Sequence, residues 1–293
     1  MGWALVELLA PLDKGLGLMR VNVLTVVKDE VDIVGLWLDA TVRWAHRIFV
    51  LDNGSTDGTY ELLQDRANRQ VILVDRYEGP FTAALRGELY RSVRQYAQEG
   101  DWWCSRGDVD EFYLEDPRLF LSRVKRPFSA VDKGSVDYVV SREDLRDFDF
   151  AGSVSRDAGK LRYIKPRKHV ELRFFRERSA VEWPEGAPGA RHVGPIWPRK
   201  IPAAHYQVRS PMQARVRFES LRRRRPDKER RSRERLGSWE DLLRPRRELV
   251  LDGGPETWKR LPHQSRSKSS IWRVSRSVLV EAVRPIRTGW TRG

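Results

Sequence analysis

The sequence DWWCSRGDVDEF at residues 101–112 joins a short apolar run to three acids, Asp108, Asp110 and Glu111, within four positions. Alternate side chains of an extended chain point to the same face, so Asp108 and Asp110 lie on one side and repel each other unless a cation joins them. Mg²⁺ and Mn²⁺ prefer such carboxylate oxygens. Taken alone, the motif is more often a solvated acidic turn after a strand, so the flanking sequence decides between the two interpretations.

Strands and helices alternate before this acidic motif. Four short apolar runs predict buried strands, at residues 21–27, 47–51, 71–74 and 102–105. Three segments between them have the apolar spacing of helices, at residues 31–45, 60–68 and 81–98. Alternation of this kind predicts an α/β domain with a parallel sheet and right-handed crossovers.

Polar residues follow three of these strands, at the point where each strand ends. Residues 28–30 come after the first strand, residues 52–53 after the second, and residues 108–111 after the fourth. In open parallel sheets, ligands bind outside the carboxyl ends of the strands. We therefore expect the three polar clusters to share one crevice, which favours a functional role for the acidic motif over a solvated turn.

The second half of the chain alternates less regularly. Apolar runs predict four further strands, at residues 136–140, 161–164, 169–175 and 201–208. Two helices are predicted, at residues 117–124 and 211–225. The second and third of these strands are close enough in sequence to form a hairpin around residues 165–168. Two segments rich in loop-forming residues predict irregular structure, at residues 145–159 and 183–198.

Length and composition define the broad class of the protein. The 293 residues suffice for one large α/β domain with an extension, and 40% apolar residues are enough for a core. The net charge of +14 favours contact with polyanions. Residues 215–247 contain 14 basic and 6 acidic residues and so contribute +8 of the +14, which means that much of the positive charge belongs to this segment. Cys104 is the only cysteine, which excludes an intrachain disulfide and a cysteine-rich zinc site.

The ends of the chain suggest where the protein acts. Charges interrupt residues 1–19, which lack the pattern of a signal peptide, and no run approaches the roughly 20 apolar residues of a membrane span. We expect a cytoplasmic protein, with three alternatives for the Arg-rich segment: a solvated helix, peripheral contact with an anionic membrane, or nucleic-acid binding. No zinc finger or RNA-binding motif supports nucleic acid. Four tryptophans that could anchor an interface favour the membrane, and they are Trp239, Trp258, Trp272 and Trp290.

Three stretches together resemble glycosyltransferase family 2. They are VVKDE at residues 26–30, VLDNGSTDGT at residues 50–59 and DVDEF at residues 108–112. The similarity is greatest to the branch whose acidic motif reads D-x-D-E-F, and HYQVRS at residues 205–210 is similar to the H-Y-x-x-R-S segment that closes the catalytic domain there. One departure is that many relatives have N-E after the first strand, where this chain has KDE at residues 28–30.

The resemblance implies a GT-A fold, a Rossmann-like α/β/α sandwich with a mainly parallel central sheet. It places the catalytic domain at residues 21–218, with a nucleotide-binding half at 21–112 and an acceptor-binding half at 113–218. Residues 1–20 would then form an N-terminal segment, and residues 219–293 a basic, largely helical C-terminal extension.

The same resemblance implies how a nucleoside diphosphate sugar is bound. Glu30 and Asp52 match acids that hold the nucleoside, with Asp52 at the base or ribose. Neighbouring residues would complete or shape that site, and they are Val27, Lys28, Asn53 and Asp57. Arg86, before the acidic motif, stands where relatives have a polar residue near the donor. It would bind a phosphate, or form an ion pair with Glu88 or Asp101.

Metal ligands are implied in the same way. Asp110 matches the direct ligand of Mn²⁺ or Mg²⁺, Asp108 would contact the ribose or the metal, and His205 matches a late histidine that completes the metal shell. A hydrogen-bonded core histidine is the alternative for His205, and His169 and His192 are weaker candidates. The cation would stabilise the negative charge of the departing nucleoside diphosphate. Without the cation, the acids of the motif would repel this anionic substrate.

An inverting transferase also needs a base that deprotonates the acceptor hydroxyl, usually a carboxylate. The candidates are Glu111, Glu143, Asp144 and Glu185, and no spacing argument decides among them. Because Glu111 directly follows the metal motif, it has the alternative role of supporting the metal ligands through hydrogen bonds. Asp144 follows a predicted strand, and Glu185 lies in the predicted long loop.

The sequence thus predicts a metal-dependent, inverting glycosyltransferase. It would transfer a sugar from a nucleoside diphosphate sugar, with a UDP-sugar expected, to a glycan, a lipid-linked intermediate or a cell-surface polysaccharide. One alternative is a basic nucleic-acid-binding protein on an α/β scaffold, which would bind in a salt-sensitive way. A sugar nucleotidyltransferase is the other, but it would need a glycine-rich phosphate loop where this chain has residues 28–30.

Overall fold

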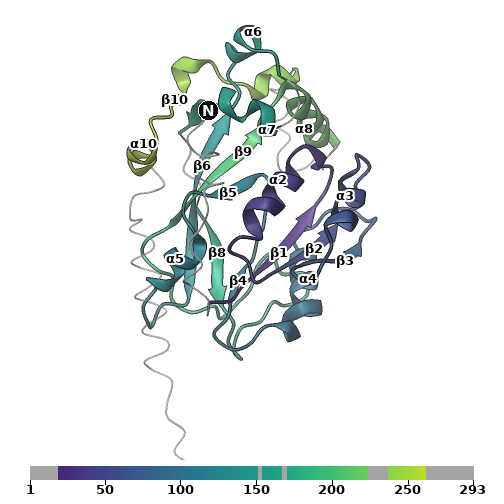
Figure 1. Cartoon of the computed structure of the whole chain (residues 1–293), viewed down its shortest axis with the longest axis vertical. Helices are drawn as coiled ribbons and strands as arrows, with labels where there is room; N and C mark the ends of the chain where they lie inside the picture. Colours follow the sequence, from purple (N-terminus) through teal and green to yellow (C-terminus); the bar gives the residue numbers. More distant parts are fainter. Residues whose placement is uncertain (1–18, 151–153, 167–169, 224–236, 262–293) are drawn as a thin grey trace, which may run out of the picture.

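The computed structural model describes residues 19–150, 154–166, 170–223 and 237–261 of the chain (Figure 1). These residues form a ten-stranded mixed sheet with helices packed against it. Eight strands follow the order β10-β7-β6-β8-β4-β1-β2-β3, while β9 pairs with β6 and carries β5 on its other side. The predicted α/β class is therefore confirmed.

The first half of the sheet is parallel. Its strands are β1 (Val21–Val27), β2 (Arg47–Asp52), β3 (Val71–Arg76) and β4 (Trp102–Cys104). The connecting helices are α2 (Val31–Thr41), α3 (Thr59–Arg66) and α4 (Leu85–Val93), and a 3-10 helix, η1 (Arg94–Tyr96), follows α4. The strand β1 lies between β2 and β4. The predicted alternation is confirmed here, with helices somewhat shorter than their apolar patterns.

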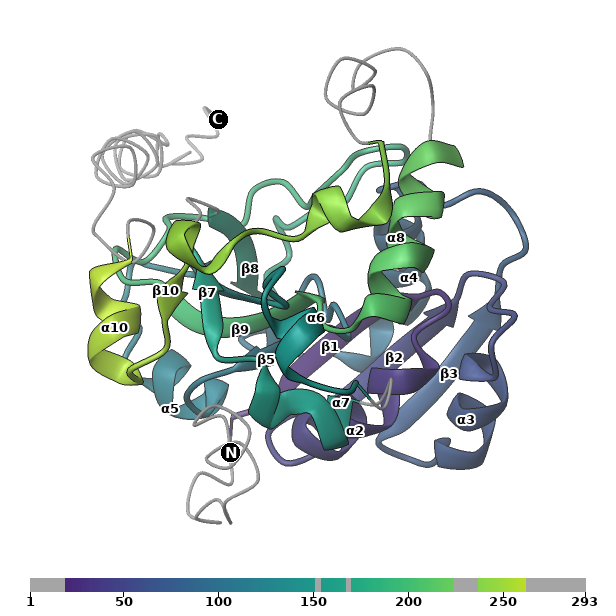
Figure 2. The ribbon, with the colours of Figure 1, turned by 90° about the horizontal axis from the view of Figure 1, so that it is seen from above.

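Helices cover both faces of this parallel half (Figure 2). On one face, Val23 of β1 and Trp37 of α2 belong to one buried apolar cluster, which α3 also joins. On the other face, Leu24 of β1 packs in a second cluster with Tyr90 of α4 and Trp103 of β4. Successive residues of β1 thus enter opposite cores, which is why its sequence is almost continuously apolar.

All strand pairs in the second half of the sheet except β6–β9 are antiparallel, which corrects the prediction of a mainly parallel sheet. Outward from β4 come β8 (Val170–Arg176), β6 (Ala130–Val139), β7 (Tyr163–Lys165) and β10 (Val250–Leu251). Because β7 and β8 each pair with β6 rather than with each other, the predicted hairpin of those two strands is wrong. The strand β6 begins at Ala130 rather than at residue 136, since polar but buried side chains interrupt its apolar pattern.

The strands β5 (Glu111–Tyr113) and β9 (Ile201–Val208) bring the late histidine beside the acidic motif. They pair antiparallel with Glu111 opposite His205, and β9 runs parallel to β6 with His205 opposite Asp137. The short strand β5 was not predicted, because its three residues directly continue the acidic motif. This pairing joins the two halves of the chain at one site.

Four short helices and the longer helix α8 fill parts of the second half. They are α5 (Pro117–Ser122), α6 (Asp144–Asp147), α7 (Val154–Asp157), the 3-10 helix η2 (Ala158–Lys160) and α8 (Pro211–Arg223). The prediction of irregular structure over residues 145–159 is therefore wrong in part, because α6, α7 and η2 are single turns too short for a periodic pattern. Residues 183–198 form the predicted long loop, with only isolated bridges to other segments.

Residues 237–261 pack against the antiparallel half. They contain η3 (Trp239–Leu242), η4 (Arg246–Glu248), β10 and α10 (Pro255–Arg260), so this part of the predicted extension is only partly helical. Leu243, Trp258 and Leu261 are buried, and Tyr138 of β6 donates a hydrogen bond to Asp252 at 2.8 Å. Trp272, Trp290 and residues 224–236 lie outside the described part. None of the described helices is long and apolar enough to cross a membrane.

Candidate functional site

The carboxyl ends of β1, β2 and β4 meet at one edge of the sheet, because these strands are parallel neighbours. Residues 28–30, 52–59 and 105–110 leave the sheet there, as the sequence predicted. Gly107 lets the third segment pass close to β1. Its N–H donates to the carbonyl oxygen of Leu24 at 2.7 Å, and a Cβ at this position would lie 2.5 Å from the Val23 side chain.

Asp52 and Asn53 begin the loop after β2, and both are buried. The backbone N–H of Ser55 donates to Oδ1 of Asp52 at 3.0 Å. The Asn53 amide donates to the carbonyl oxygens of Tyr77 and Gly79 at 3.0 and 2.8 Å. Within the described residues, Oδ2 of Asp52 and Oδ1 of Asn53 have no hydrogen-bond partner. Buried acceptors are usually satisfied, so these two oxygens mark a place where ligand hydroxyl or N–H groups can bind.

Three of the predicted nucleotide-site residues hold the loops after β1 and β2 together. Lys28 Nζ donates to the carbonyl oxygen of Asn53 at 2.9 Å. Asp57 Oδ2 accepts the N–H of Val31, the first residue of α2, at 3.0 Å, which satisfies an otherwise unpaired donor of the helix start. Val27 is buried, and its carbonyl oxygen accepts the N–H of Asn53 at 2.8 Å. These contacts shape the loop that carries the unpartnered acceptors.

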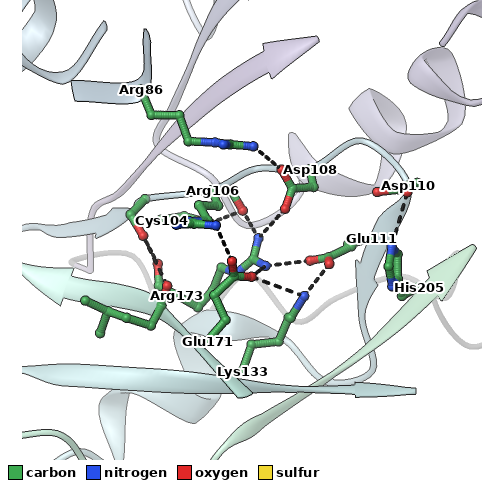
Figure 3. A network of polar contacts seen from close by, with 12 residues as sticks. Arg86, Cys104, Arg106, Asp108, Asp110, Glu111, Lys133, Glu171, Arg173 and His205 are labelled. Carbon is green, nitrogen blue, oxygen red and sulfur yellow. Dashed lines mark hydrogen bonds and ion pairs between the residues drawn. The ribbon is translucent and has the colours of Figure 1, made fainter. Parts of the chain in front are cut away.

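Asp110, directly before β5, faces His205 of β9 (Figure 3). The Nε2 atom of His205 lies 3.2 Å from Oδ2 of Asp110, and Nδ1 lies 2.9 Å from Oδ1 of Asp137 on β6. Burial alone would lower the pKa of His205, but the two carboxylates outweigh it and raise the pKa to about 10. Burial alone would raise the pKa of Asp110, and the charge of His205 lowers it to about 2. The imidazole ring is thus fixed between two carboxylates.

Asp108 lies between two arginines. Arg86 of α4 donates to Oδ1 of Asp108 at 2.7 Å, and Nη1 of Arg173 on β8 lies 3.5 Å from Oδ2. Burial alone would raise the pKa of Asp108, but the charges of Arg86, Arg173 and Lys133 hold it well below its usual range. The carboxylate of Asp108 is therefore already neutralised by cations of the chain.

A buried ion-pair network supports the acidic motif from the side of β6 and β8 (Figure 3). Arg173 Nη2 lies 2.8 Å from a carboxylate oxygen of Glu111 and 2.8 Å from one of Glu171. Lys133 also donates to Glu111, and Arg106 donates to Glu171. Arg173 and Lys133 are fully buried, where a charge is tolerated only when it is paired. Glu111 is thus a structural partner of these cations.

Arg209, which follows β9, ties this strand to the start of α2. Its guanidinium donates to both oxygens of Asp32 at 2.8 and 2.6 Å, and also to Glu30. Burial raises the pKa of Glu30 to about 7, since the effect of burial and of the negative charges of Asp110 and Asp32 exceeds the opposing effect of Arg209. The interaction between Glu30 and Asp110 places both carboxylates at the same edge of the sheet.

The remaining candidate bases have different surroundings. Asp144 is fully buried at the start of α6, where it accepts a backbone N–H at 2.7 Å and the guanidinium of Arg246 at 2.6 Å. Glu143 accepts the backbone N–H of Arg246 at 3.0 Å. None of the contacts described for these two acids reaches Asp110. Glu185 is exposed in the long loop.

The weaker histidine candidates do not join the site. His192 is exposed in the long loop, and its Nε2 atom lies 3.6 Å from a carboxylate oxygen of Glu182. His169 lies outside the described residues. Of the three histidines proposed from the sequence, His205 alone is placed beside the acidic motif within the described part of the chain.

Two groups of side chains have ligand atoms within 4.8 Å of one another, close enough to hold a cation. They are Asp110, Glu111 and His205, and Asp108, Glu111 and Glu171. The second group is already neutralised by the buried cations around it. In the first group, Asp110 and His205 retain 17% and 10% side-chain exposure, and they provide the oxygen and nitrogen ligands that Mn²⁺ accepts.

The sequence predicted no role for the charged side chains around the acidic motif and His205, which are Lys133, Asp137, Glu171, Arg173 and Arg209. The available signal was two charged residues two positions apart on β8, Glu171 and Arg173, and two that are four positions apart on β6, Lys133 and Asp137. Alternation of this kind normally marks a solvated strand face. Only their burial, which is partial for Glu171, distinguishes these side chains from those of a solvated strand face.

A scan against models of known protein families and a search of curated proteins found no match to this chain. The protein is therefore described by its fold and its site. It is an α/β protein with an acidic, histidine-containing site at the carboxyl edge of its parallel strands.

Proposed function

We propose that this protein is a metal-dependent glycosyltransferase with a GT-A fold, of the type found in glycosyltransferase family 2. The observation that carries the proposal is the pair formed by Asp110 and His205 at the strand edge that also holds Asp52 and Asn53. This edge offers cation ligands and unpartnered acceptors for a nucleoside within one group of loops, as a nucleoside diphosphate sugar requires.

The residues at this edge fit Mn²⁺ or Mg²⁺. Asp110 would bind the cation through Oδ2 and His205 through Nε2, the two atoms that lie 3.2 Å apart. The hydrogen bond of His205 Nδ1 to Asp137 keeps Nε2 on the side of the site, an arrangement that orients metal-bound histidines in many proteins. When bound, the cation supplies positive charge that stabilises the departing nucleoside diphosphate.

The other residues of the edge would hold the donor. The free oxygens of Asp52 and Asn53 accept hydrogen bonds from the ribose hydroxyls or from N–H groups of the base. Arg86 would contact the phosphates, since its guanidinium is fixed by Asp108 and lies 5.4 Å from the centre of the Phe81 ring. Asp108 would then orient Arg86 rather than bind the cation, which leaves that role to Asp110.

The long loop supplies the candidate base. Arg106 Nη2 donates to the carbonyl oxygen of Pro188 at 3.4 Å, so this loop contacts the segment that leads into the acidic motif. We assign the base to Glu185 because Glu111 and Asp144 hold buried ion pairs, whereas Glu185 is exposed. The acceptor would be a glycan or a lipid-linked intermediate, the donor a UDP-sugar, and the location the cytoplasm with peripheral contact to an anionic membrane.

The proposal is tested by measuring the affinity of the protein for UDP by isothermal titration calorimetry, with and without Mn²⁺. We expect Mn²⁺ to tighten UDP binding in the wild type. In the Asp110→Asn variant, the affinity for UDP in the presence of Mn²⁺ should fall by about 100-fold or more. Even residues that only support metal ligands contribute about 10- to 100-fold to metal affinity, and Asp110 is proposed as a direct ligand. Asp65→Asn on the exposed surface of α3 is the matched control and should behave as the wild type.

Release of UDP from a panel of UDP-sugars then identifies the donor. Donor hydrolysis should require Mn²⁺ or Mg²⁺ and should fall in Asp110→Asn. UDP binding that is indifferent both to the cation and to this substitution would contradict the proposed metal site and the glycosyltransferase assignment with it.

A further inference from the structure

A cavity of about 530 Å³ lies between α5, the segment that leads into β9, and α10. This volume is in the range of small-molecule sites, roughly 300–1,000 Å³. Figure 2 shows α5 and α10 on the same side of the molecule. The cavity is therefore built from segments more than 130 residues apart in the sequence, and none of its walls belongs to the loops that carry the proposed donor site.

The strand pair β5–β9 separates this cavity from the acidic motif. Leu114 and Pro202 line the cavity, and the N–H of Leu114 donates to the carbonyl oxygen of Pro202 at 3.0 Å. Both residues lie three positions from the pair formed by Glu111 and His205. Three positions correspond to about 10 Å along a strand, and an odd number of positions places side chains on opposite faces. The side chain of Pro202, which lines the cavity, thus points to the face of β9 opposite to that of His205.

The walls of the cavity combine apolar surface with positive charge. Trp197 provides a partly exposed aromatic ring, Phe120 and Trp258 are each 5% exposed, and three prolines provide further apolar surface. The charged residues that line it are Glu115, Arg123, Arg199, Lys200 and Lys259, which gives four basic side chains against one acid. A ligand that fits must therefore present both an apolar face and negative charge.

Existing contacts fix part of this charge and leave part of it exposed. Arg123 lies over the Phe120 ring at 5.3 Å from its centre and is paired with Glu115, while Lys259 is paired with Glu256 on α10. Arg199 is exposed at the cavity. A guanidinium is suited to the planar, two-point recognition of a carboxylate, sulfate or phosphate.

We propose that this cavity binds an anionic sugar residue of a glycan chain, at a site separate from the donor edge. A pyranose ring has an apolar C–H face that packs on tryptophan, while its carboxylate, sulfate or phosphate group would pair with Arg199. The concave shape and the partly exposed ring of Trp197 favour a sugar over the flat surface of a membrane. That the bound glycan is the acceptor of the transferase rests on the proposed function, whereas the binding of an anionic glycan does not.

The experiment measures binding of tetragalacturonate to the full chain by isothermal titration calorimetry, without donor or divalent cation. Maltotetraose is the neutral comparison. Arg199→Glu should weaken binding of the acidic tetrasaccharide by about tenfold or more, the scale of one lost charge-assisted contact. Arg69→Glu makes the same change of charge at an exposed position before β3 and should stay within about twofold of the wild type.

Trp197→Phe is a second variant that keeps an aromatic ring in contact with Phe128 while reducing the surface for the sugar, and its melting temperature reports whether it folds. It should weaken binding as well. No binding of tetragalacturonate, equal binding of maltotetraose, or equal losses in Arg199→Glu and Arg69→Glu would each overturn the proposal. Competition by UDP would also overturn it, by assigning the cavity to the nucleotide. Because no cation or donor is present, failure of the proposed transferase activity would leave this result unaffected.

Discussion

Replacing Arg173 by methionine tests whether the ion-pair network supports the acidic motif. Arg173 is fully buried and lies 2.8 Å from carboxylate oxygens of both Glu111 and Glu171, with a third carboxylate, that of Asp108, at 3.5 Å. Methionine matches the apolar stem of arginine and lacks the guanidinium group. The substitution therefore removes one positive charge and leaves the acids with fewer partners in a buried place.

We expect Arg173→Met to lower the free energy of unfolding by about 3–5 kcal/mol at pH 7, the cost of leaving one side of a buried ion pair uncompensated. For a protein of this size each kcal/mol lowers the melting temperature by roughly 2–4 °C, so the fall should be roughly 6–20 °C. Arg66→Met is the matched control, because Arg66 and Asp39 form a 2.7 Å pair with about half of each side chain exposed. That pair should contribute less than about 1 kcal/mol.

The effect should depend on pH in a defined direction. Burial alone would raise the pKa values of Glu171 and Asp108, but neighbouring cations, Arg173 among them, hold both below their usual values near 4. A lowered pKa in the folded state stabilises the fold above the pKa of the unfolded chain, and this contribution is lost as the pH falls. The difference between wild type and Arg173→Met should therefore be greatest above about pH 5 and shrink below about pH 4.

Urea denaturation at pH 7 and at pH 4, followed by circular dichroism, measures both quantities. A loss below about 1 kcal/mol at pH 7, equal to that of Arg66→Met, would refute the reasoning, because it would mean that the three acids do not need Arg173. A loss that stays constant between the two pH values would refute the electrostatic explanation and leave packing as the cause.

Two further predictions concern the metal site and the C-terminal segment. Asp137→Asn should weaken Mn²⁺ binding by about 10- to 100-fold in calorimetry, since Asp137 orients the ring of His205 at 2.9 Å, and an unchanged affinity would contradict that role. Leu243→Ala should lower the free energy of unfolding by about 2–5 kcal/mol, because Leu243 is buried within residues 237–261. Leu251→Ala, at a half-exposed position of β10, is its control, and similar losses in both variants would contradict the burial argument.

The strands of the parallel half and their direction could be predicted from the sequence, whereas in the antiparallel half most strands were predicted but their pairing was not. In β1 both faces are buried by helices, so almost every residue is apolar and the strand is visible as a continuous run. In β6 all ten residues are buried as well, but Asp132, Lys133, Ser135 and Asp137 are among them. Lys133 pairs with Glu111 and Glu171, and Asp137 pairs with His205, all on other strands, which no local pattern records. The beginning of β6 was not predicted for that reason, nor was the pairing of β7 and β8 with it.

The roles of the three acids of the motif also depend on contacts with distant strands, which the local sequence does not record. The spacing of the three acids in the sequence does not show which of them binds a cation. It shows only that Asp108 and Asp110 lie on one face. The structure separates them by their partners: Asp108 is held by Arg86 and Arg173, Glu111 by Lys133 and Arg173, and Asp110 by His205. A carboxylate that already balances an arginine or a lysine has little charge left for a divalent cation, whereas an imidazole can exchange its proton for one. Asp110 is the acid of the motif best placed to bind a cation, because Arg86, Lys133 and Arg173 pair with the other two. These cations lie 22 to 65 positions away from the motif in the sequence, so the motif alone does not predict them.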